Sequence, residues 1–171
     1  MQTPAQTLDD FLSQIKDLNP TNLDLIRIIK AISISAIDIK EIIETAPISN
    51  MTGSTGKTNI HKEEIQLLDN SANTIFVENL METQLISHIV SEELQDPLHK
   101  PTNSPSYFVS IDPVDGSSNI TSSITIGSIL GIWKLDNSEQ INDNLFIPNS
   151  PQMIAAIYTI YGPSTILVIA C

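Results

Sequence analysis

The sequence predicts a layered α/β (α+β) fold, in which helices pack on a mixed or largely antiparallel sheet. Two observations support this prediction. Apolar residues recur at helical spacing in the first half of the chain, over about 7–16, 22–44 and 62–85. Short segments rich in β-branched residues follow in the second half, at about 107–111, 123–135, 154–161 and 165–169. Helices and strands separated along the chain in this way pack as layers around one core.

Each predicted helix carries its own signal. Thr7 and Asp10 have the spacing of a capping box, which starts the first helix, and Pro20 interrupts the chain before the second. The second helix is rich in isoleucine, whose β-branched side chain lowers helix propensity, so we expect tertiary packing to stabilise it. Asp69 borders the apolar stripe of the third helix, where it can either face solvent or project into a site.

Glycine, proline and polar residues mark the connections between these elements. We expect loops or polar connectors over 51–59, 94–105 and 136–151. The first of these segments ends like a phosphate-binding P-loop, but Met51 stands where that motif requires its first glycine. The segment also follows a predicted helix instead of a strand, so it does not predict an NTPase.

The most informative segment has the sequence DPVDGSS over 112–118, at the end of a predicted strand. Pro113 fixes its own φ and lacks an N–H, so we expect Asp112 and Asp115 to turn toward one point and leave the strand ladder. Gly116 permits a close backbone approach, and the two serines after it add hydroxyl and amide donors. Carboxylate and carbonyl oxygens suit a hard cation, and converging donors suit a phosphate.

A second acidic pair, Glu92 and Glu93, ends another short apolar run. Neighbouring side chains on an extended chain point to opposite faces, so one acid can bind a metal while the other faces a different part of a pocket. Alone, such a pair is more typical of a solvated surface. Its significance comes from the aspartate motif further along the chain.

Together the two motifs resemble class 1 fructose-1,6-bisphosphatase. The resemblance depends mainly on VSEE at 90–93 and DPVDGSSNI at 112–120. Supporting matches extend over nearly the whole chain: KAIS at 30–33, IQLLD at 65–69, IGSILGI at 126–132, AAIY at 155–158 and YGPST at 161–165. The resemblance implies that residues 1–171 form the N-terminal domain of that fold, without the sugar-binding domain that follows it in the family.

The resemblance also implies a role for each acid in phosphate-ester hydrolysis. The implied ligands of Mg²⁺, or Mn²⁺, are oxygen donors on the two motifs: Glu92, Asp112, Asp115 and the Val114 carbonyl. The implied phosphate-binding residues are Asp115, Gly116, Ser117 and Ser118. Asp69 and Glu93 are the implied catalytic residues, which would position and deprotonate the attacking water. Clustered acids suit this chemistry, because metal ions acidify water and neutralise phosphoryl charge.

Several positions depart from the family pattern. Thr121 stands where an acid is usual, Val114 where leucine is usual, and Ile157 where a small glycine is expected. The chain, at 171 residues, has about half the length of such an enzyme. The half that it lacks carries the family's contacts to the sugar and the distal phosphate, so we expect this chain alone to be a poor bisphosphatase.

The composition of the chain excludes some classes of binding partner. A net charge of −12 argues against nucleic acid or an anionic membrane, since both bind basic surfaces. The single cysteine, Cys171, excludes an intramolecular disulfide and is consistent with a reducing compartment. The first residues resemble neither a secretory signal nor a transit peptide, so we expect a cytoplasmic protein. The expected partners are a sugar bisphosphate and either further copies of the chain or a full-length paralogue.

Three alternatives remain open from the sequence. Gly131-Ile132-Trp133 and Tyr161-Gly162-Pro163 lean toward sedoheptulose 1,7-bisphosphatase, a related enzyme. Inositol monophosphatases share the start of the aspartate motif but prefer threonine after its glycine. The chain could also be a non-catalytic subunit that pairs through an unfinished sheet.

Tyr107 matches a residue of the AMP pocket in animal enzymes, but the N-terminal residues of that pocket do not match.

Overall fold

The computed structural model describes residues 7–18, 23–49, 54–58, 64–100, 106–122, 124–135 and 153–171. The described α-helices are α1 (Leu8–Leu18), α2 (Leu23–Ser49) and α3 (Leu67–Glu82), and a 3₁₀ helix, η2, covers Ser117–Ser122. The described strands are β1 (Ser54–Thr58), β2 (Glu64–Gln66), β3 (Ile86–Ser91), β4 (Leu98–His99), β5 (Ser106–Asp115), β6 (Ile126–Leu135), β7 (Met153–Tyr161) and β8 (Thr165–Ala170).

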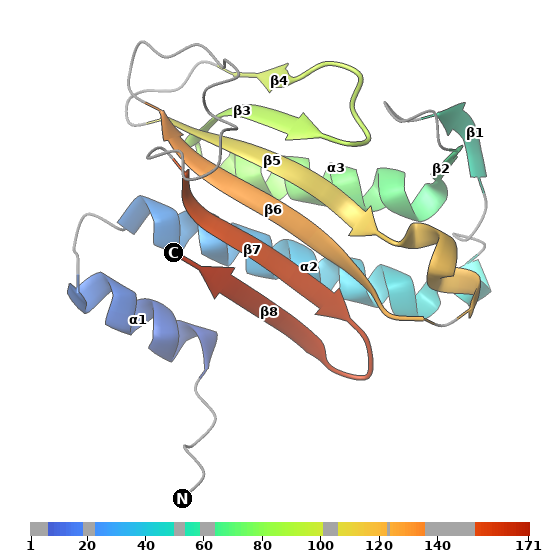
Figure 1. Cartoon of the computed structure of the whole chain (residues 1–171), viewed down its shortest axis with the longest axis horizontal. Coiled ribbons are helices and arrows are strands. Elements are labelled where there is room, and N and C mark those ends of the chain that lie inside the picture. The colour runs from blue at the N-terminus through green and yellow to red at the C-terminus, as the bar shows by residue number, and fades with distance from the viewer. Residues whose placement is uncertain are drawn as a thin grey trace, which may run out of the picture.

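The main sheet has six strands in the order β4-β3-β5-β6-β7-β8, and β1 and β2 form a separate pair. Only the β3–β5 pairing in the main sheet is parallel, and its other pairings are antiparallel. In Figure 1, α2 and α3 lie behind the strands, so these helices cover the same face of the sheet. The predicted fold class, helices on a mixed sheet, is confirmed.

The core lies between α2, α3 and the sheet. Ile28, Ile29, Ile32 and Ile39 of α2 are fully buried, and α3 contributes Phe76 among other buried residues. Full burial of an aliphatic side chain contributes roughly 1.5–3 kcal/mol relative to exposure. This burial offsets the low helix propensity of the isoleucine-rich sequence.

The first helix is capped as its sequence predicts. Thr7 Oγ1 accepts a hydrogen bond from the Asp10 N–H at 3.1 Å, and Asp10 Oδ2 accepts one from the Thr7 N–H at 3.3 Å. The buried side chain of Leu12 joins α1 to the core, and an ion pair of 2.7 Å links Lys30 of α2 to Asp9.

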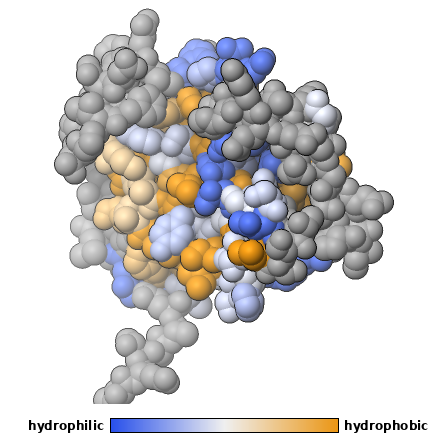
Figure 2. Space-filling view, turned by 45° about the vertical axis from the view of Figure 1, so that its right-hand side comes forward, coloured by the Kyte–Doolittle hydropathy of each residue, from blue (hydrophilic) through white to orange (hydrophobic). Residues whose placement is uncertain are grey.

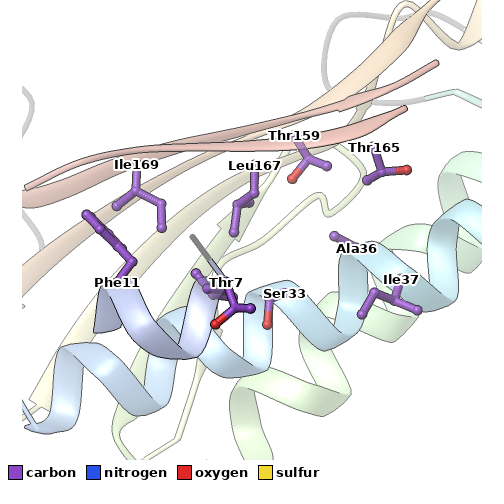
Figure 3. Close-up of a pocket in the computed structure, with 10 residues that line it drawn as sticks. Thr7, Phe11, Ser33, Ala36, Ile37, Thr159, Thr165, Leu167 and Ile169 are labelled. Carbon is purple, nitrogen blue, oxygen red and sulfur yellow. The ribbon is translucent and has the colours of Figure 1, made fainter. Parts of the chain in front are cut away.

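A cavity remains between α1, α2 and the margin of the sheet at β7 and β8. Its volume is about 530 Å³, and its lining is mainly apolar, with Phe11, Ile37, Leu167 and Ile169 among the residues. Figure 3 shows the strand side chains pointing across this space toward the two helices. The hydroxyl of Thr165 is buried there and has no hydrogen-bond partner among the described residues.

Several predicted boundaries were wrong. Part of the loop expected over 51–59 is β1, which pairs with β2, and β2 occupies the expected start of the third helix. Within the loop expected over 94–105, β4 pairs with β3. The second helix continues to Ser49, beyond its expected end. The predicted connector over 136–151 lies outside the described residues.

None of the helices in the described ranges is long and apolar enough to cross a membrane.

Candidate functional site

The parallel pairing of β3 with β5 places the two acidic motifs side by side. Ser91, the residue before Glu92, is in register with Ile111, the residue before Asp112. The Glu92 N–H then donates a hydrogen bond to the Ile111 carbonyl at 3.1 Å. Because parallel strands end at the same edge of a sheet, Glu92 and Asp112 emerge together although they are far apart in sequence.

The aspartate motif departs from the predicted local geometry. β5 does not end before Asp112 but continues to Asp115. Asp112 pairs with Ile129 and Asp115 pairs with Gly127, and a register shift separates these two pairs. Pro113, which cannot donate to a ladder, lies within this shift, as expected for a proline inside a sheet. The irregularity therefore brings the two aspartates to the strand end without ending the strand.

A buried hydroxyl pair supports this irregular segment. Ser128 Oγ donates a hydrogen bond to the Pro113 carbonyl at 2.6 Å and lies 2.8 Å from the Tyr161 hydroxyl. Both side chains are almost completely buried. Since the single Ser128 hydrogen points to Pro113, Tyr161 is the donor in the second bond. Sequence analysis missed both residues, although a serine inside the apolar run over 126–135 was a usable signal.

The turn after the aspartates requires glycine. Gly116 has a φ of +80°, in the left-handed region that a side chain disfavours. The Asn119 N–H donates to the Gly116 carbonyl at 2.8 Å and starts the 3₁₀ helix η2. Ser117 is half-buried and Ser118 is exposed. The serines therefore follow directly after the acids, at the same end of the strands.

The pKa of one carboxylate, that of Asp112, is shifted by burial and by neighbouring acids. Burial, the largest cause, and the nearby carboxylates of Glu92 and Asp115 together raise the pKa of Asp112 from its ordinary value of 3.8 to about 7. A hydrogen bond from the Val114 backbone opposes this shift, and Asp69 adds a smaller effect in the same direction as the other acids. Three predicted site residues, Asp69, Glu92 and Asp115, thus lie within electrostatic range of a fourth, Asp112.

Asp69 and Glu93, the two implied catalytic residues, lie in different surroundings. Asp69 lies in the first turn of α3 and is only 4% exposed, so the solvated alternative for this residue was wrong. Glu93 is half-buried and lies in a turn, where its N–H donates to Ser91 Oγ at 3.3 Å. The expected extended conformation of Glu92 and Glu93 was therefore wrong, because β3 ends at Ser91 and both acids lie in the turn that follows.

Comparison with known proteins shows the family of this chain. The family model described as "Fructose-1-6-bisphosphatase, N-terminal domain" matches residues 6–171. The chain belongs to the fructose-1,6-bisphosphatase family. The family resemblance predicted from the two acidic motifs is thereby confirmed.

Relatives in the fructose-1,6-bisphosphatase family match nearly all of this chain. The Saccharomyces cerevisiae fructose-1,6-bisphosphatase is 34% identical over 148 residues, which cover 85% of this chain and 42% of that protein. The class 1 enzyme of Sulfurihydrogenibium sp. is 33% identical over 165 residues, covering 95% and 50% respectively. The crystal structure of Leishmania major fructose-1,6-bisphosphatase in holo form superposes with a TM-score of 0.83 at 28% identity, covering 99% of this chain and 52% of that one. The chain spans about half the length of the curated relatives it matches.

The donor chemistry of the site fits a hard cation. Carboxylate oxygens are gathered at the strand ends, where burial and the neighbouring acids raise the pKa of Asp112. Within the part of the chain that the structure describes, however, no three His, Cys, Asp or Glu side chains lie close enough to coordinate an ion as they stand. Coordination of an ion by these acids would therefore require their side chains to move closer together.

Proposed function

We propose that this chain provides the acidic half of a Mg²⁺-dependent sugar-bisphosphate phosphatase, with Mn²⁺ as a possible substitute. The proposed reaction is the hydrolysis of the 1-phosphate of fructose 1,6-bisphosphate to fructose 6-phosphate and phosphate. The observation that carries this proposal is the convergence of Glu92, which follows β3, and Asp69 of α3 on the two aspartates of β5, Asp112 and Asp115. Family membership supports the same reaction class.

In this proposal the cation is held by Glu92, Asp112, Asp115 and the Val114 carbonyl. When bound, it supplies an acidified water and neutralises charge on the phosphoryl oxygens. Carboxylates and a carbonyl are the oxygen donors that Mg²⁺ prefers. The site should also bind the cation more weakly as pH falls, because protons compete for the same carboxylates.

The remaining residues act directly on the phosphate and the water. The backbone turn at Gly116 and the hydroxyls of Ser117 and Ser118 donate hydrogen bonds to the departing phosphate. Asp69 and Glu93 orient the water and accept its proton. The water oxygen forms a bond to phosphorus, and the bond between phosphorus and the sugar oxygen breaks. Most of the catalytic effect is then positioning and charge stabilisation.

A steady-state assay of phosphate release tests the proposal. The purified chain, supplied with Mg²⁺, should hydrolyse fructose 1,6-bisphosphate slowly, and Asp115→Ala should abolish this activity. Asp38→Asn provides a matched control, since it removes an exposed acid on α2 away from the site. Equal rates for the wild-type chain and the Asp115 variant would refute the assignment. Faster release from sedoheptulose 1,7-bisphosphate would identify the alternative substrate.

A specific observation favours a second candidate function, that of a subunit. β8 is the last strand in the order of the sheet, so its outer edge is open among the described strands. An open edge suits a chain that pairs with another chain. Absence of phosphate release from the isolated chain, together with stable hetero-oligomer formation, would support this candidate.

A further inference from the structure

The hairpin of β3 and β4 carries a pair of histidines that the candidate active site does not use. His88 of β3 is in register with His99 of β4, and their ring centroids lie 4.4 Å apart with the ring planes at 46°. In Figure 1 these two strands lie at the margin of the main sheet opposite β8. The sequence spacing of the two histidines does not predict a metal site, because only the strand register brings their rings together.

Both rings lie on the side of the sheet that faces away from α2 and α3. His88 is in register with Phe108, which alternates along β5 with residues of the helix-covered core. Directly opposed residues on neighbouring strands share one face of a sheet. Figure 2 shows hydrophilic side chains (blue) beside apolar ones (orange) on this side of the molecule. His88 is half-buried and His99 is exposed, so an ion can reach the pair from solvent.

A bulge and a serine fix the orientation of the His88 ring. The register of β3 with β5 shifts between Ile86 and His88, so Ser87 is the extra residue of a bulge. Ser87 Oγ donates a hydrogen bond to the Tyr107 carbonyl at 3.2 Å and lies 2.9 Å from His88 Nδ1. Because the single hydroxyl hydrogen points to the carbonyl, Nδ1 carries the ring hydrogen and donates it to Ser87 Oγ. The lone pair of the neutral ring is then on Nε2.

This arrangement is typical of a histidine that binds a metal ion. Metal-ligating histidines commonly donate their second ring N–H to a protein oxygen, which fixes both the tautomer and the orientation of the ring. Burial, and to a lesser extent the charge of His99, lowers the pKa of His88 from its ordinary value of 6.5. The lowered pKa favours the neutral imidazole, which is the form that coordinates metals.

The separation of the two rings suits one shared ion. Imidazole nitrogens bind Zn²⁺ at about 2.0–2.1 Å, so two rings on one ion have centroids roughly 4.5–5 Å apart when the bonds meet at about 90–110°. The observed 4.4 Å is close to this range, and the exposed His99 ring can rotate to aim a nitrogen at the ion. Within the described ranges no third His, Cys, Asp or Glu side chain joins the pair, so water completes the coordination.

We propose that His88 and His99 form a binding site for one divalent transition-metal ion, of the class of Zn²⁺, Ni²⁺ and Cu²⁺. Imidazole suits these ions, whereas Mg²⁺ and Mn²⁺ prefer oxygen ligands such as the acids of the candidate active site. The ion cross-links β3 to β4, and the segment between these strands begins with Glu92 and Glu93. Metal binding therefore restrains the turn that holds two acids of the candidate active site. The proposal does not depend on the hydrolytic activity.

Zn²⁺ is the probe, and calorimetry with the full 171-residue chain in excess Mg²⁺ should detect one bound Zn²⁺ ion. His99→Ala should weaken Zn²⁺ binding at least about 30-fold, since loss of even an indirect support of a metal ligand costs roughly 10–100-fold. His88→Ala should have a similar effect. Asp112→Asn is the matched control, because it removes a carboxylate of the acidic site and should leave the affinity of the histidine pair unchanged.

Circular dichroism and thermal melting establish that each variant is folded, and His99→Ala changes only an exposed side chain. With Cu²⁺ in place of Zn²⁺, electron paramagnetic resonance should show coupling to two imidazole nitrogens in the wild-type chain and to one in His99→Ala. The proposal is overturned if folded His99→Ala binds Zn²⁺ as tightly as the wild-type chain, if Asp112→Asn abolishes binding that the histidine variants retain, or if Cu²⁺ shows no such coupling. Absence of phosphate release would count against the proposed reaction alone.

Discussion

The two faces of the sheet differ in burial, although the same strands form both. Toward the helices, residues such as Leu130, Ile132 and Ile157 are at most 2% exposed. On the opposite side of the sheet, which we call the outer face, Ile129 and Tyr158 alternate with them along β6 and β7 and are about half exposed. Apolar composition alone therefore does not reveal which face stabilises the fold. Register decides which apolar residues of a strand are buried against the helices and which are exposed.

The largest expected difference between the faces is in stability. Phe76→Ala removes a fully buried aromatic side chain of α3 and should lower the free energy of unfolding by about 3–5 kcal/mol. Tyr158→Ala, on the outer face, should change it by only about 0.5 kcal/mol. Denaturant titrations of both variants measure the contrast. Similar losses would mean that the outer face is also part of the core.

A smaller effect is expected at Ser128, a buried residue that supports the aspartate segment of the candidate site. Ser128→Ala removes the bond to the Pro113 carbonyl and should cost about 1–3 kcal/mol, while also weakening Mg²⁺ binding because the aspartate segment loses its support. Ser35→Ala is the control: this serine is equally buried and bonds to Ala31 and Asn79 on the helical side. Its loss should reduce stability but not affinity for Mg²⁺. Equal effects on metal binding would remove Ser128 from the site.

The acids around Asp112 should make the free energy of unfolding depend on pH. The folded-state pKa of Asp112, about 7, lies above its ordinary value of 3.8, so the folded chain binds the proton more tightly than the unfolded chain. This contribution to stability is fully present below about pH 4 and is lost as pH rises to about 7. Melting temperatures with a chelator present should therefore fall across this range, less steeply in Asp112→Asn. Mg²⁺ should restore stability at the upper end, and an identical profile for the variant would contradict the assignment.

The smallest expected effect is at Thr165, which lines the cavity between the helices and the sheet. Thr165→Val replaces a buried hydroxyl that has no hydrogen-bond partner among the described residues with a methyl group of similar size. Removing such a desolvated group should stabilise the chain, by about 0.5–1 kcal/mol. Thermal melting measures the gain. A loss of stability would indicate that the hydroxyl is hydrated in the cavity.

Much of the fold was predictable because periodicity is a local property. The apolar stripe of Phe76 and Leu80 in α3 and the strand around Gly131, β6, followed from the local sequence. The pairing of β1 with β2 did not, since the sequence STGKT over 54–58 carries no β-branched apolar alternation and is a strand only through its partner. The continuation of β5 through Pro113 was missed for a related reason, because the register shift that accommodates the proline depends on β6.

The candidate site was predictable to the extent that it depends on motifs. The acids of both motifs and Gly116 could be named from the sequence, and the structure places Glu92 beside Asp112. The burial of Asp69 could not be predicted, because it depends on how α3 packs against β5. Their assigned roles as metal ligands and catalytic residues stay predictions.

The most direct test of the central claim is to locate a bound ion. Anomalous scattering from a crystal of the chain grown with Mn²⁺ should show a peak in contact with the carboxylates of Glu92, Asp112 and Asp115 and with the Val114 carbonyl. A peak bound elsewhere, or a fully occupied crystal in which Glu92 takes no part in coordination, would contradict the account.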